Sequence, residues 1–242
     1  MAGGRWFVIG PVADGVVLCT MQGPDLSSQT RFADMATAQR AADALPGPLV
    51  SIAAGVPVTV PAPILPTEIA GALPDLVQDQ PRGVLDGWVR LWVAGALRGD
   101  PDWDGVICAV QGDVTHWIQV SASEIVSFQG FLTGRLIASL NGSAEADADA
   151  LSDSLSRPER LAAHLRSAEI AGNGAAVTGH LTGAELAAAR PFWLGQEVLI
   201  IADGARMQTA LAAQGVSAVT RDPQAMLDAG LAVLAESIAR SP

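Results

Sequence analysis

The stretch GVICAVQGDVTHWIQVSASEIVSFQ, residues 105–129, holds three apolar runs separated by two short polar turns. The runs cover residues 105–110, 114–121 and 124–129, and they are rich in the β-branched and aromatic residues that favour strands. Gly112 and Asp113 are typical of a tight hairpin turn. The stretch therefore predicts three consecutive strands joined by tight turns, and the segment 133–140 that follows opens a helix.

The beginning of the chain has the same pattern. Apolar runs at 5–10 and 14–20 indicate a hairpin, and 27–33 can supply a third strand. An Ala-rich amphipathic helix is predicted over 36–45, and a buried strand over 48–55. An order of three strands, a helix and a strand thus occurs twice. Mixed sheets flanked by helices in two related lobes predict an α/β protein, with lobes at residues 1–94 and 95–242 and a cleft between them.

The other segments are predicted as follows. Residues 56–69 are proline-rich and should be extended, because proline excludes a helix there. Residues 141–154 are acidic and small, and should form a flexible surface excursion with one short helix. The remaining predictions are helices at 83–97, 157–172, 182–190, 205–215 and 222–240, with Asp222 and Pro223 starting the last, and strands at 197–204 and 216–220.

Composition excludes several classes of function. The chain has 242 residues and a net charge of -11, which argues against a nucleic-acid groove or an anionic membrane as partner. All 14 basic residues are arginine, so a Walker-type lysine, a Schiff-base lysine and a lysine general base are all excluded. No apolar run is long enough for a transmembrane helix, and residues 1–10 do not resemble a signal peptide. We expect a cytoplasmic protein.

The cysteines and histidines form no set with metal-binding spacing. Cys19 and Cys108 lie inside strand-like runs and should be buried free thiols. His116, His164 and His180 are far apart in the sequence and indicate no ligand set.

Two hairpin turns could contact a phosphate. Such a turn needs glycine for close approach, a hydroxyl donor and a carboxylate for the metal. The first, residues 10–15, offers only Asp14, which more often serves the turn itself, and Pro11 lacks a backbone N–H. The second, residues 111–117, contains Gly112, Asp113 and Thr115. It can be an ordinary hairpin, or a turn in which Asp113 holds a cation or acts as a base while Thr115 donates to a phosphoryl oxygen.

Two helix starts have similar alternatives. At FLTGR, residues 131–135, Thr133 is expected to be the N-cap, but this helix N-terminus with Gly134 and Arg135 could also take an anion. At ADGAR, residues 202–206, Gly204 stands in a strand-to-helix connection that could equally be a turn beside a nucleotide.

Residues 104–140 and 177–219 resemble the 2-dehydro-3-deoxygalactonokinases, and the resemblance extends over 83–237 with a faint continuation upstream. It implies a two-lobed, actin-like sugar-kinase fold with a shortened first lobe. It also implies transfer of the ATP γ-phosphate to a 2-keto-3-deoxy sugar acid, with Mg²⁺. The matching residues are Gly112, Thr115, Trp117, Thr133, Gly134, Gly179, Gly183, Ala184 and Glu185.

The chain departs from the family pattern at several charged and hydroxyl positions. Gly10 to Ala13 replace the Asp-Trp-Gly-Thr of the first phosphate loop, and Gly87 to Arg90 replace Arg-Gly-Glu-Glu. In the second loop His116 stands for lysine and Asp113 for threonine, and Arg135 reverses the charge of a glutamate. A sequence kept for its fold but released from catalysis would show this pattern.

These observations leave three readings open. The first is a weak ATP-dependent kinase of 2-dehydro-3-deoxy-D-galactonate, in which Asp113 or Asp86 supplies the catalytic carboxylate and Asp113 the Mg²⁺ ligand. The second is an inactive homologue that binds a sugar acid or nucleotide, or regulates a partner; the third is an interaction module whose cleft is filled by Trp88 and Trp92. A homodimer is possible in each. The expected cofactor contacts are Gly112, Thr115, Thr133, Gly134 and Gly204, and the expected substrate contacts are Arg135 and His116.

Overall fold

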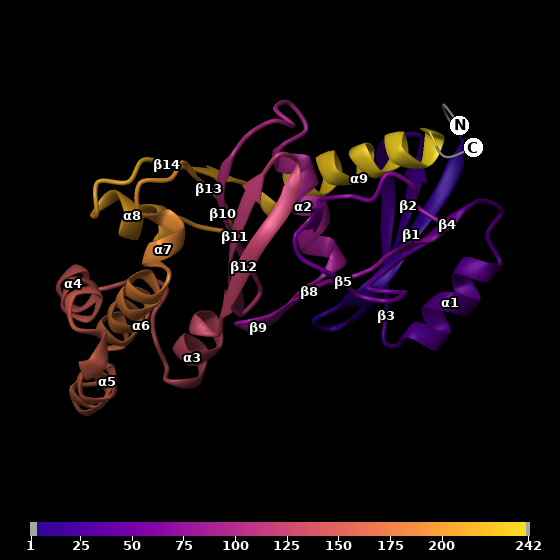
Figure 1. Ribbon diagram of the computed structural model, residues 1–242. Coiled ribbons are helices and arrows are strands. Elements are labelled where there is room, and N and C mark those ends of the chain that lie inside the picture. The colour runs from indigo at the N-terminus through magenta and orange to yellow at the C-terminus, as the bar shows by residue number, and fades with distance from the viewer. Residues whose placement is uncertain (1–3, 241–242) are drawn as a thin grey trace. The chain divides into compact units, whose positions relative to one another are not determined.

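The computed structural model describes residues 4–240, the side chains of the last two excepted, and divides the chain into two compact units (Figure 1). The first unit comprises residues 4–103, 121–127 and 222–240, and the second comprises 104–120 and 128–221. The division differs from lobes at 1–94 and 95–242, because the C-terminal helix packs in the first unit.

The first unit is built on a mixed five-stranded sheet. Its strand order is β3-β2-β1-β4-β7; β1, β2 and β3 are antiparallel, and β1, β4 and β7 are parallel. These strands are β1 (Arg5–Val12), β2 (Gly15–Gln22), β3 (Asp25–Phe32), β4 (Leu49–Ile52) and β7 (Ala72–Leu73), and helix α1 (Met35–Asp43) follows β3. The predicted strands and helix in this part of the chain are confirmed.

Alternating side chains of β1 serve two hydrophobic clusters. Phe7 and Ile9 pack with residues of α1, whereas Trp6 and Val8 belong to a cluster that includes Leu91. Because successive strand residues point to opposite faces, the continuous apolar run at the start of the chain means that both faces of this sheet are covered.

Helices α2 (Gly87–Ala96) and α9 (Pro223–Arg240) cross closely in the first unit. A Cβ on Gly95 would lie 2.0 Å from the carbonyl oxygen of Met226, and one on Gly230 would lie 2.0 Å from that of Leu91. Only glycine allows this approach. As predicted, Asp222 caps α9, since its carboxylate accepts from the Ala225 N–H at 2.7 Å.

The start of α2 differs from the predicted helix at 83–97. Residues 82–85 form β9 (Arg82–Leu85), which makes a hairpin with β8 (Leu76–Asp79), and β5 (Val58–Thr59) completes a small sheet. Asp86 then caps α2 by accepting from the Val89 N–H at 3.0 Å. A short apolar run such as 82–85 is compatible with the periodicity of a strand and with that of a helix. The helix begins where Asp86 can cap it.

Arg90 of α2 is buried in the first unit and holds the proline-rich segment. Its guanidinium donates to the carbonyl oxygens of Ile64 at 3.0 Å, Pro63 at 3.1 Å and Pro74 at 2.5 Å. Burial lowers the pKa of Arg90 to about 10, opposed by the charge of Asp75. This segment is extended, as predicted; it includes β6 (Ala62–Pro63), which pairs with the first residues of β12.

The second unit repeats the order of the first. Its sheet runs β12-β11-β10-β13-β14, with an antiparallel β10–β11 pair and parallel β10, β13 and β14. The strands are β10 (Gly105–Gln111), β11 (Val114–Ser121), β12 (Glu124–Phe131), β13 (Val198–Ile201) and β14 (Ala218–Arg221). The three strands predicted from residues 105–129 and the repeated pattern are both confirmed.

The helices of the second unit pack against this sheet and against one another. They are α3 (Thr133–Ser139), α4 (Ala148–Ser156), η1 (Pro158–Arg160), α5 (Leu161–Ile170), α6 (Gly174–Ala188), α7 (Arg190–Trp193) and α8 (Arg206–Ala212). Two predictions need correction. The short helix predicted within 141–154 is present as α4, but its Leu151 is buried, so the helix belongs to the core and not to a surface excursion. Helix α6 begins eight residues before the predicted 182, where Asn173 caps it.

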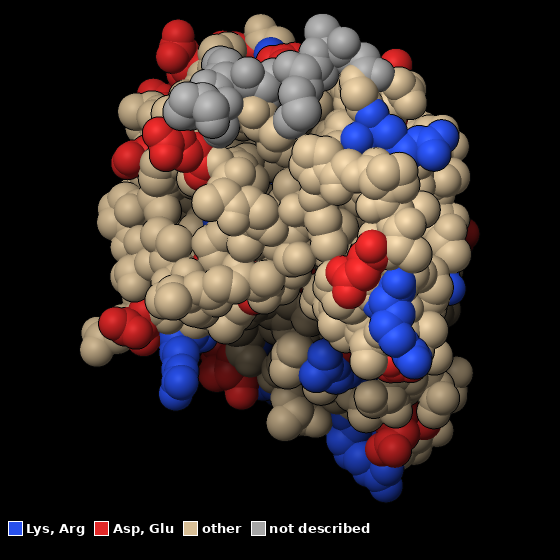
Figure 2. All heavy atoms as spheres, turned by 90° about the vertical axis from the view of Figure 1, so that its right-hand side faces the viewer, with Lys and Arg blue, Asp and Glu red and all other residues tan. Residues whose placement is uncertain are grey.

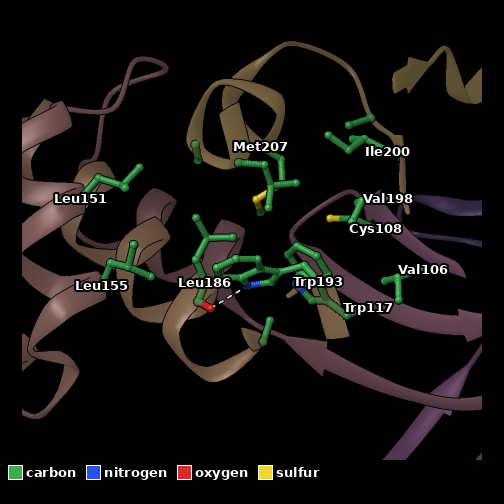
Figure 3. Packing of buried hydrophobic residues seen from close by; sticks show 14 residues of the cluster. Val106, Cys108, Trp117, Leu151, Leu155, Leu186, Trp193, Val198, Ile200 and Met207 are labelled. Carbon is green, nitrogen blue, oxygen red and sulfur yellow. Dashed lines mark hydrogen bonds between the residues drawn. The ribbon is translucent and has the colours of Figure 1, made fainter. Parts of the chain in front are cut away.

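The core of the second unit surrounds two tryptophans (Figure 3). Trp117 comes from β11, and Trp193 donates its indole N–H to the Leu186 carbonyl at 2.9 Å. Leu151 and Leu155 of α4 reach the same cluster. None of the helices in the described part of the chain combines the length and apolar character needed to cross a bilayer.

Candidate functional site

The β10–β11 hairpin closes through a two-residue turn in the second unit. Gln111 pairs with Val114, which leaves Gly112 and Asp113 in the turn. Gly112 has a φ of 60°, a conformation that glycine adopts without strain. The backbone geometry of this turn therefore favours the predicted glycine.

Asp113 is tied to the start of α3. Arg135 donates from Nε to the Asp113 carboxylate at 2.6 Å, and its backbone N–H donates to the Asp113 carbonyl at 3.1 Å. A Cβ on Gly134 would lie 2.9 Å from Asp113 backbone atoms, so this contact also requires glycine. The hydrogen bond from Arg135 lowers the pKa of Asp113. Asp113 was predicted as a metal ligand or general base, and Arg135 as a substrate contact. In the structure the two side chains instead form an ion pair with each other.

Thr115 and His116 point to opposite faces of the sheet, because they are consecutive on β11. Thr115 lies on the same face as Trp117, and its side chain is fully buried. The His116 ring lies on the other face, where its Nδ1 is 3.6 Å from the position of a Cβ on Gly130. One ligand on one face of this sheet cannot contact both side chains.

The face that carries Thr115 and Trp117 meets a buried carboxylate, Glu185 of α6. Glu185 is 3% exposed. Its Oε1 accepts from Trp117 Nε1 at 3.0 Å. Burial raises the pKa of Glu185, while the hydroxyl of Thr133, the indole of Trp117, the charge of Arg206 and the hydroxyl of Thr115 act in the opposite direction. Side chains from β11, α3 and α8 thus surround one carboxyl group.

Thr133 has a different role from the predicted N-cap. The N-cap of α3 is Leu132, which makes no side-chain cap hydrogen bond. The Thr133 hydroxyl instead donates to Glu185. Two buried oxygens in this cluster, Glu185 Oε2 and Thr115 Oγ1, have no hydrogen-bond partner of good geometry. Buried polar atoms of this kind are uncommon and often mark a functional group.

The position of Glu185 is fixed by close packing of α6 against α4. A Cβ on Gly179 would lie 2.4 Å from the Asp147 carbonyl oxygen, and one on Gly183 would lie 2.2 Å from that of Leu151. These glycines are four residues apart, so they lie on one face of the helix. They explain in physical terms two of the glycines that match the family pattern.

The strand-to-helix connection after β13 borders a cavity. Gly204 has a φ of 97°, and α8 starts two residues later at Arg206. A cavity of about 490 Å³ lies between α8 and the segment that leads into α4. Half of its lining residues are alanines, and polar groups come from Glu145, Ser152, Arg206, Thr209 and Gln214. This volume is typical of a small-molecule site.

The first hairpin turn, in the first unit, offers little to a phosphate. Gly10 and Pro11 continue β1, and the turn residues are Ala13 and Asp14. The carbonyl of Pro11 accepts from the Trp88 indole at 2.7 Å. Asp86, the other predicted carboxylate, is used as the cap of α2. Asp14 is exposed at the tip of the turn.

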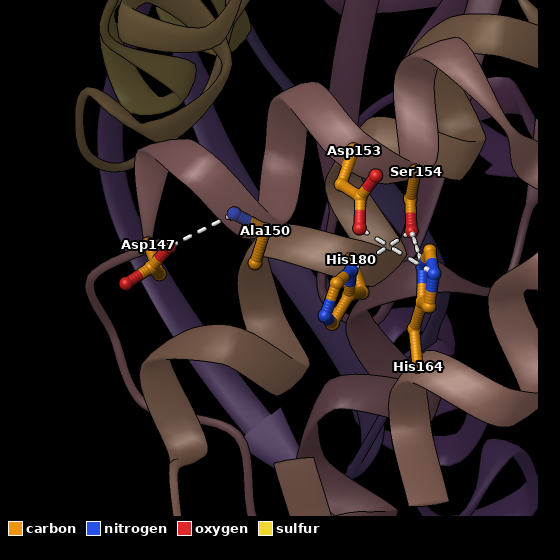
Figure 4. A network of polar contacts seen from close by, with 6 residues as sticks. All are labelled: Asp147, Ala150, Asp153, Ser154, His164 and His180. Carbon is orange, nitrogen blue, oxygen red and sulfur yellow. Dashed lines mark hydrogen bonds and ion pairs between the residues drawn. The ribbon is translucent and has the colours of Figure 1, made fainter. Parts of the chain in front are cut away.

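Two histidines that are distant in the sequence meet in the second unit (Figure 4). Ser154 Oγ lies 2.9 Å from His180 Nδ1 and 3.2 Å from His164 Nδ1, and His164 Nε2 lies 3.4 Å from an Asp153 oxygen. Burial and the charge of His164 lower the pKa of His180. Among residues 4–240, no three His, Cys, Asp or Glu side chains are arranged to hold a metal ion.

Sequence reasoning omitted Glu185 and Arg206 from the site. Glu185 did appear as a match to the family pattern, and that was the available signal. Its burial and its contacts with β11 and α3 depend on the packing of α6, which the pattern does not contain.

Solved structures support the fold assignment. The chain is similar to a protein assigned as a 2-dehydro-3-deoxygalactonokinase from Sinorhizobium meliloti, with 19% identity, 97% of this chain and 99% of that chain covered, and a TM-score of 0.78. It is also similar to the activator of 2-hydroxyisocaproyl-CoA dehydratase from Clostridium difficile, with bound ADPNP (12% identity, 97% and 95% coverage, TM-score 0.50). Component A of the Acidaminococcus fermentans (R)-2-hydroxyglutaryl-CoA dehydratase gives 12% identity, 99% coverage of both chains and a TM-score of 0.50.

These similarities confirm the predicted α/β, actin-like fold with mixed sheets flanked by helices. No curated protein sequence matches the chain. The family model described as 2-keto-3-deoxy-galactonokinase matches residues 38–234. The chain therefore belongs to the 2-keto-3-deoxy-galactonokinase family.

Proposed function

We propose that this protein binds a nucleotide in the second unit and is a weak kinase of a 2-keto-3-deoxy sugar acid, with 2-dehydro-3-deoxy-D-galactonate as substrate. Membership of the family supports the kinase class. The observation that carries nucleotide binding is the cavity of about 490 Å³ beside the Gly204 turn. A similar fold, the Clostridium difficile activator, carries bound ADPNP.

The lining of this cavity suits a nucleotide. Alanines at 205, 210 and 213 of the α8 region, with Leu151 of α4, give an apolar wall for a flat base. Gln214 and Thr209 can hydrogen-bond to its edge. Arg206 is the cation among the lining residues and can pair with a phosphate.

Weak turnover follows from the residues at the two turns. Phosphoryl transfer relies on positioned charges at the phosphates. The first hairpin turn has no hydroxyl group, and its one carboxylate, Asp14, is exposed at the tip. The Pro11 carbonyl already accepts a hydrogen bond from the Trp88 indole. At the second hairpin the Asp113 carboxylate is bound by Arg135. As positioned, Asp113 therefore does not fit a Mg²⁺ ligand, and we assign no step to that ion.

The substrate contacts remain proposals. If the Asp113–Arg135 pair opens, Arg135 can bind the carboxylate of a sugar acid. Opening is inexpensive, because the two side chains are 48% and 56% exposed and water can replace the contacts of each. His116 lies on the opposite face of β11 and would need a different ligand from Thr115.

Calorimetric titration with ATP tests the nucleotide site. We expect binding by the natural protein, and Ala213→Leu should weaken it at least about tenfold by filling the cavity. Ala212→Leu is the matched control: both alanines are exposed on or beside α8, but Ala212 does not line the cavity. Equal affinities of the two variants would contradict the assignment of this cavity.

Release of ADP in the presence of 2-dehydro-3-deoxy-D-galactonate tests the reaction. Ordinary kinases turn over at about 1–100 per second. We expect a rate at least about 100-fold lower, because one missing charge-stabilising group costs about 10²–10³. Turnover at ordinary rates would contradict the reading of the first hairpin.

The first hairpin also favours a second candidate, a binding protein without catalysis. Binding of ATP or of the sugar acid with no ADP release would identify it. The charge distribution on one face gives no support to a nucleic-acid partner. On the face shown in Figure 2, basic residues lie among acidic and uncharged ones and form no continuous basic patch.

A further inference from the structure

We propose that Glu185 is a positioning residue that joins the Gly112–Asp113 turn to the nucleotide cavity, and that it takes up a proton when a nucleotide phosphate pairs with Arg206. This inference rests on the proposed nucleotide binding. According to this proposal, the buried Glu185 carboxyl group holds the turn in place and also couples nucleotide binding to proton uptake.

The geometry places Glu185 beneath the turn. Trp117, four residues after Asp113, donates to it at 3.0 Å. Thr133, adjacent to the Gly134 that contacts Asp113, donates to it as well. The hairpin and α3 are thus joined at two places, through Asp113 and Arg135 at the tip and through Glu185 at the base. Removing the basal link should loosen the turn although the exposed pair remains.

The charges around Glu185 explain why nucleotide binding would favour its protonation. The titratable or charged groups that face it are Arg206 of α8 and the Cys108 thiol of β10. Cys108 stays neutral, because burial raises its pKa well above the ordinary value. Arg206 is therefore the charge that favours ionised Glu185. A phosphate that pairs with Arg206 would offset this charge, and Glu185 would then bind a proton more readily.

Two buried oxygens without a hydrogen-bond partner indicate where Glu185 would carry the proton. Glu185 Oε2 and Thr115 Oγ1 are both buried and lack a partner of good geometry. The Thr115 hydroxyl is close enough to act on the Glu185 charge. A carboxyl protonated at Oε2 becomes a donor, and a hydroxyl oxygen can accept. The Thr115 hydroxyl, which can also donate to the ionised carboxylate, can therefore pair with Glu185 in either protonation state.

Calorimetry in buffers of different ionisation enthalpy measures the protons taken up per ATP bound. We expect net uptake by the natural protein beyond that of Glu185→Gln, which cannot titrate. The phosphates of ATP titrate in both proteins, so the difference reports Glu185. Glu185→Gln resembles the protonated carboxyl, and its Oε1 can still accept from Trp117 and Thr133, so by linkage it should bind ATP at least as tightly as the natural protein.

Thr182→Val is the matched control. Thr182 lies on the same helix and is fully buried, and its hydroxyl makes no hydrogen bond to Glu185. We expect its ATP affinity and proton uptake to equal those of the natural protein. If Glu185→Gln does not fold, Thr133→Val should weaken ATP binding several-fold and Thr133→Ser should restore it, because serine keeps the donor.

The outcomes separate the two proposals. No ATP binding by the natural protein overturns nucleotide binding, and this inference with it. Proton uptake by Glu185→Gln equal to that of the natural protein overturns only the role of Glu185. Loss of both in the Thr182→Val control would show that any change in α6 has this effect, and would also overturn it.

Discussion

Replacing Gly183 by alanine should destabilise the second unit, because α4 and α6 cross without room for a side chain. A Cβ at Gly183 would lie 2.2 Å from the Leu151 carbonyl oxygen and 3.0 Å from the Leu155 nitrogen. These are backbone atoms, so no side-chain rotation can relieve the clash. The helices must instead separate by about 1.2 Å to reach ordinary contact at 3.4 Å.

The magnitude follows from two opposing effects. Inserting a methyl group into a well-packed region costs about 1–3 kcal/mol, and the backbone contact puts this case at the upper end. Alanine returns about 1 kcal/mol, since it favours a helix more than glycine does. The net loss is about 2 kcal/mol, which lowers the melting temperature of a chain of this size by about 4–8 °C.

Thermal unfolding followed by circular dichroism at 222 nm measures this change. Gly99→Ala is the control, because a Cβ there meets nothing within 4 Å. Its melting temperature should stay near that of the natural protein, since exposed substitutions without lost contacts change stability by about 0.5 kcal/mol or less. A Gly183→Ala protein that melts together with this control would refute the close helix contact.

Three further outcomes are expected. Arg90→Met should lower the free energy of unfolding in urea by about 3–5 kcal/mol, because three buried carbonyls lose their donor; a loss under 1 kcal/mol would contradict the buried network. Burial raises the pKa of Glu185. Relative to Glu185→Gln, the natural protein should therefore be most stable below the unfolded pKa of 4.5 and lose stability as pH rises to the folded pKa, whereas a parallel pH dependence would exclude the shift. Burial raises the pKa of Cys19 to about 12 and that of Cys108 well above its ordinary value, so a thiol reagent at pH 8 should label both only after unfolding.

Much of the candidate site could be located from sequence, but the roles of its residues could not. Gly112 and Gly134 were predicted as turn and helix-start residues; the backbone conformation favours glycine at 112, and a close backbone contact requires it at 134. Thr133 was expected to cap α3, but its hydroxyl reaches a carboxylate on another helix. Local patterns identify a residue that can donate a hydrogen bond; they do not identify which acceptor the fold brings to it.

Asp113 shows that the sequence also does not determine which charged group a carboxylate will pair with. A carboxylate in a glycine-containing turn can hold a cation, and sequence alone left that open. The structure brings Arg135 to it, 22 residues away in the chain. Whether a carboxylate is available for a metal depends on its neighbours in space, and for Asp113 the neighbour is an arginine.

The sequence by itself determined the order of elements and their repetition, because strand and helix periods, turn glycines and capping aspartates act over a few residues. Even there, the start of α2 was settled by packing and capping together. Only the tertiary structure decided that Glu185 lies among Trp117, Thr133 and Arg206. Trp117 and Glu185 are 68 positions apart, and their hydrogen bond forms because Gly179 and Gly183 let α6 pack closely enough to bury a carboxyl group.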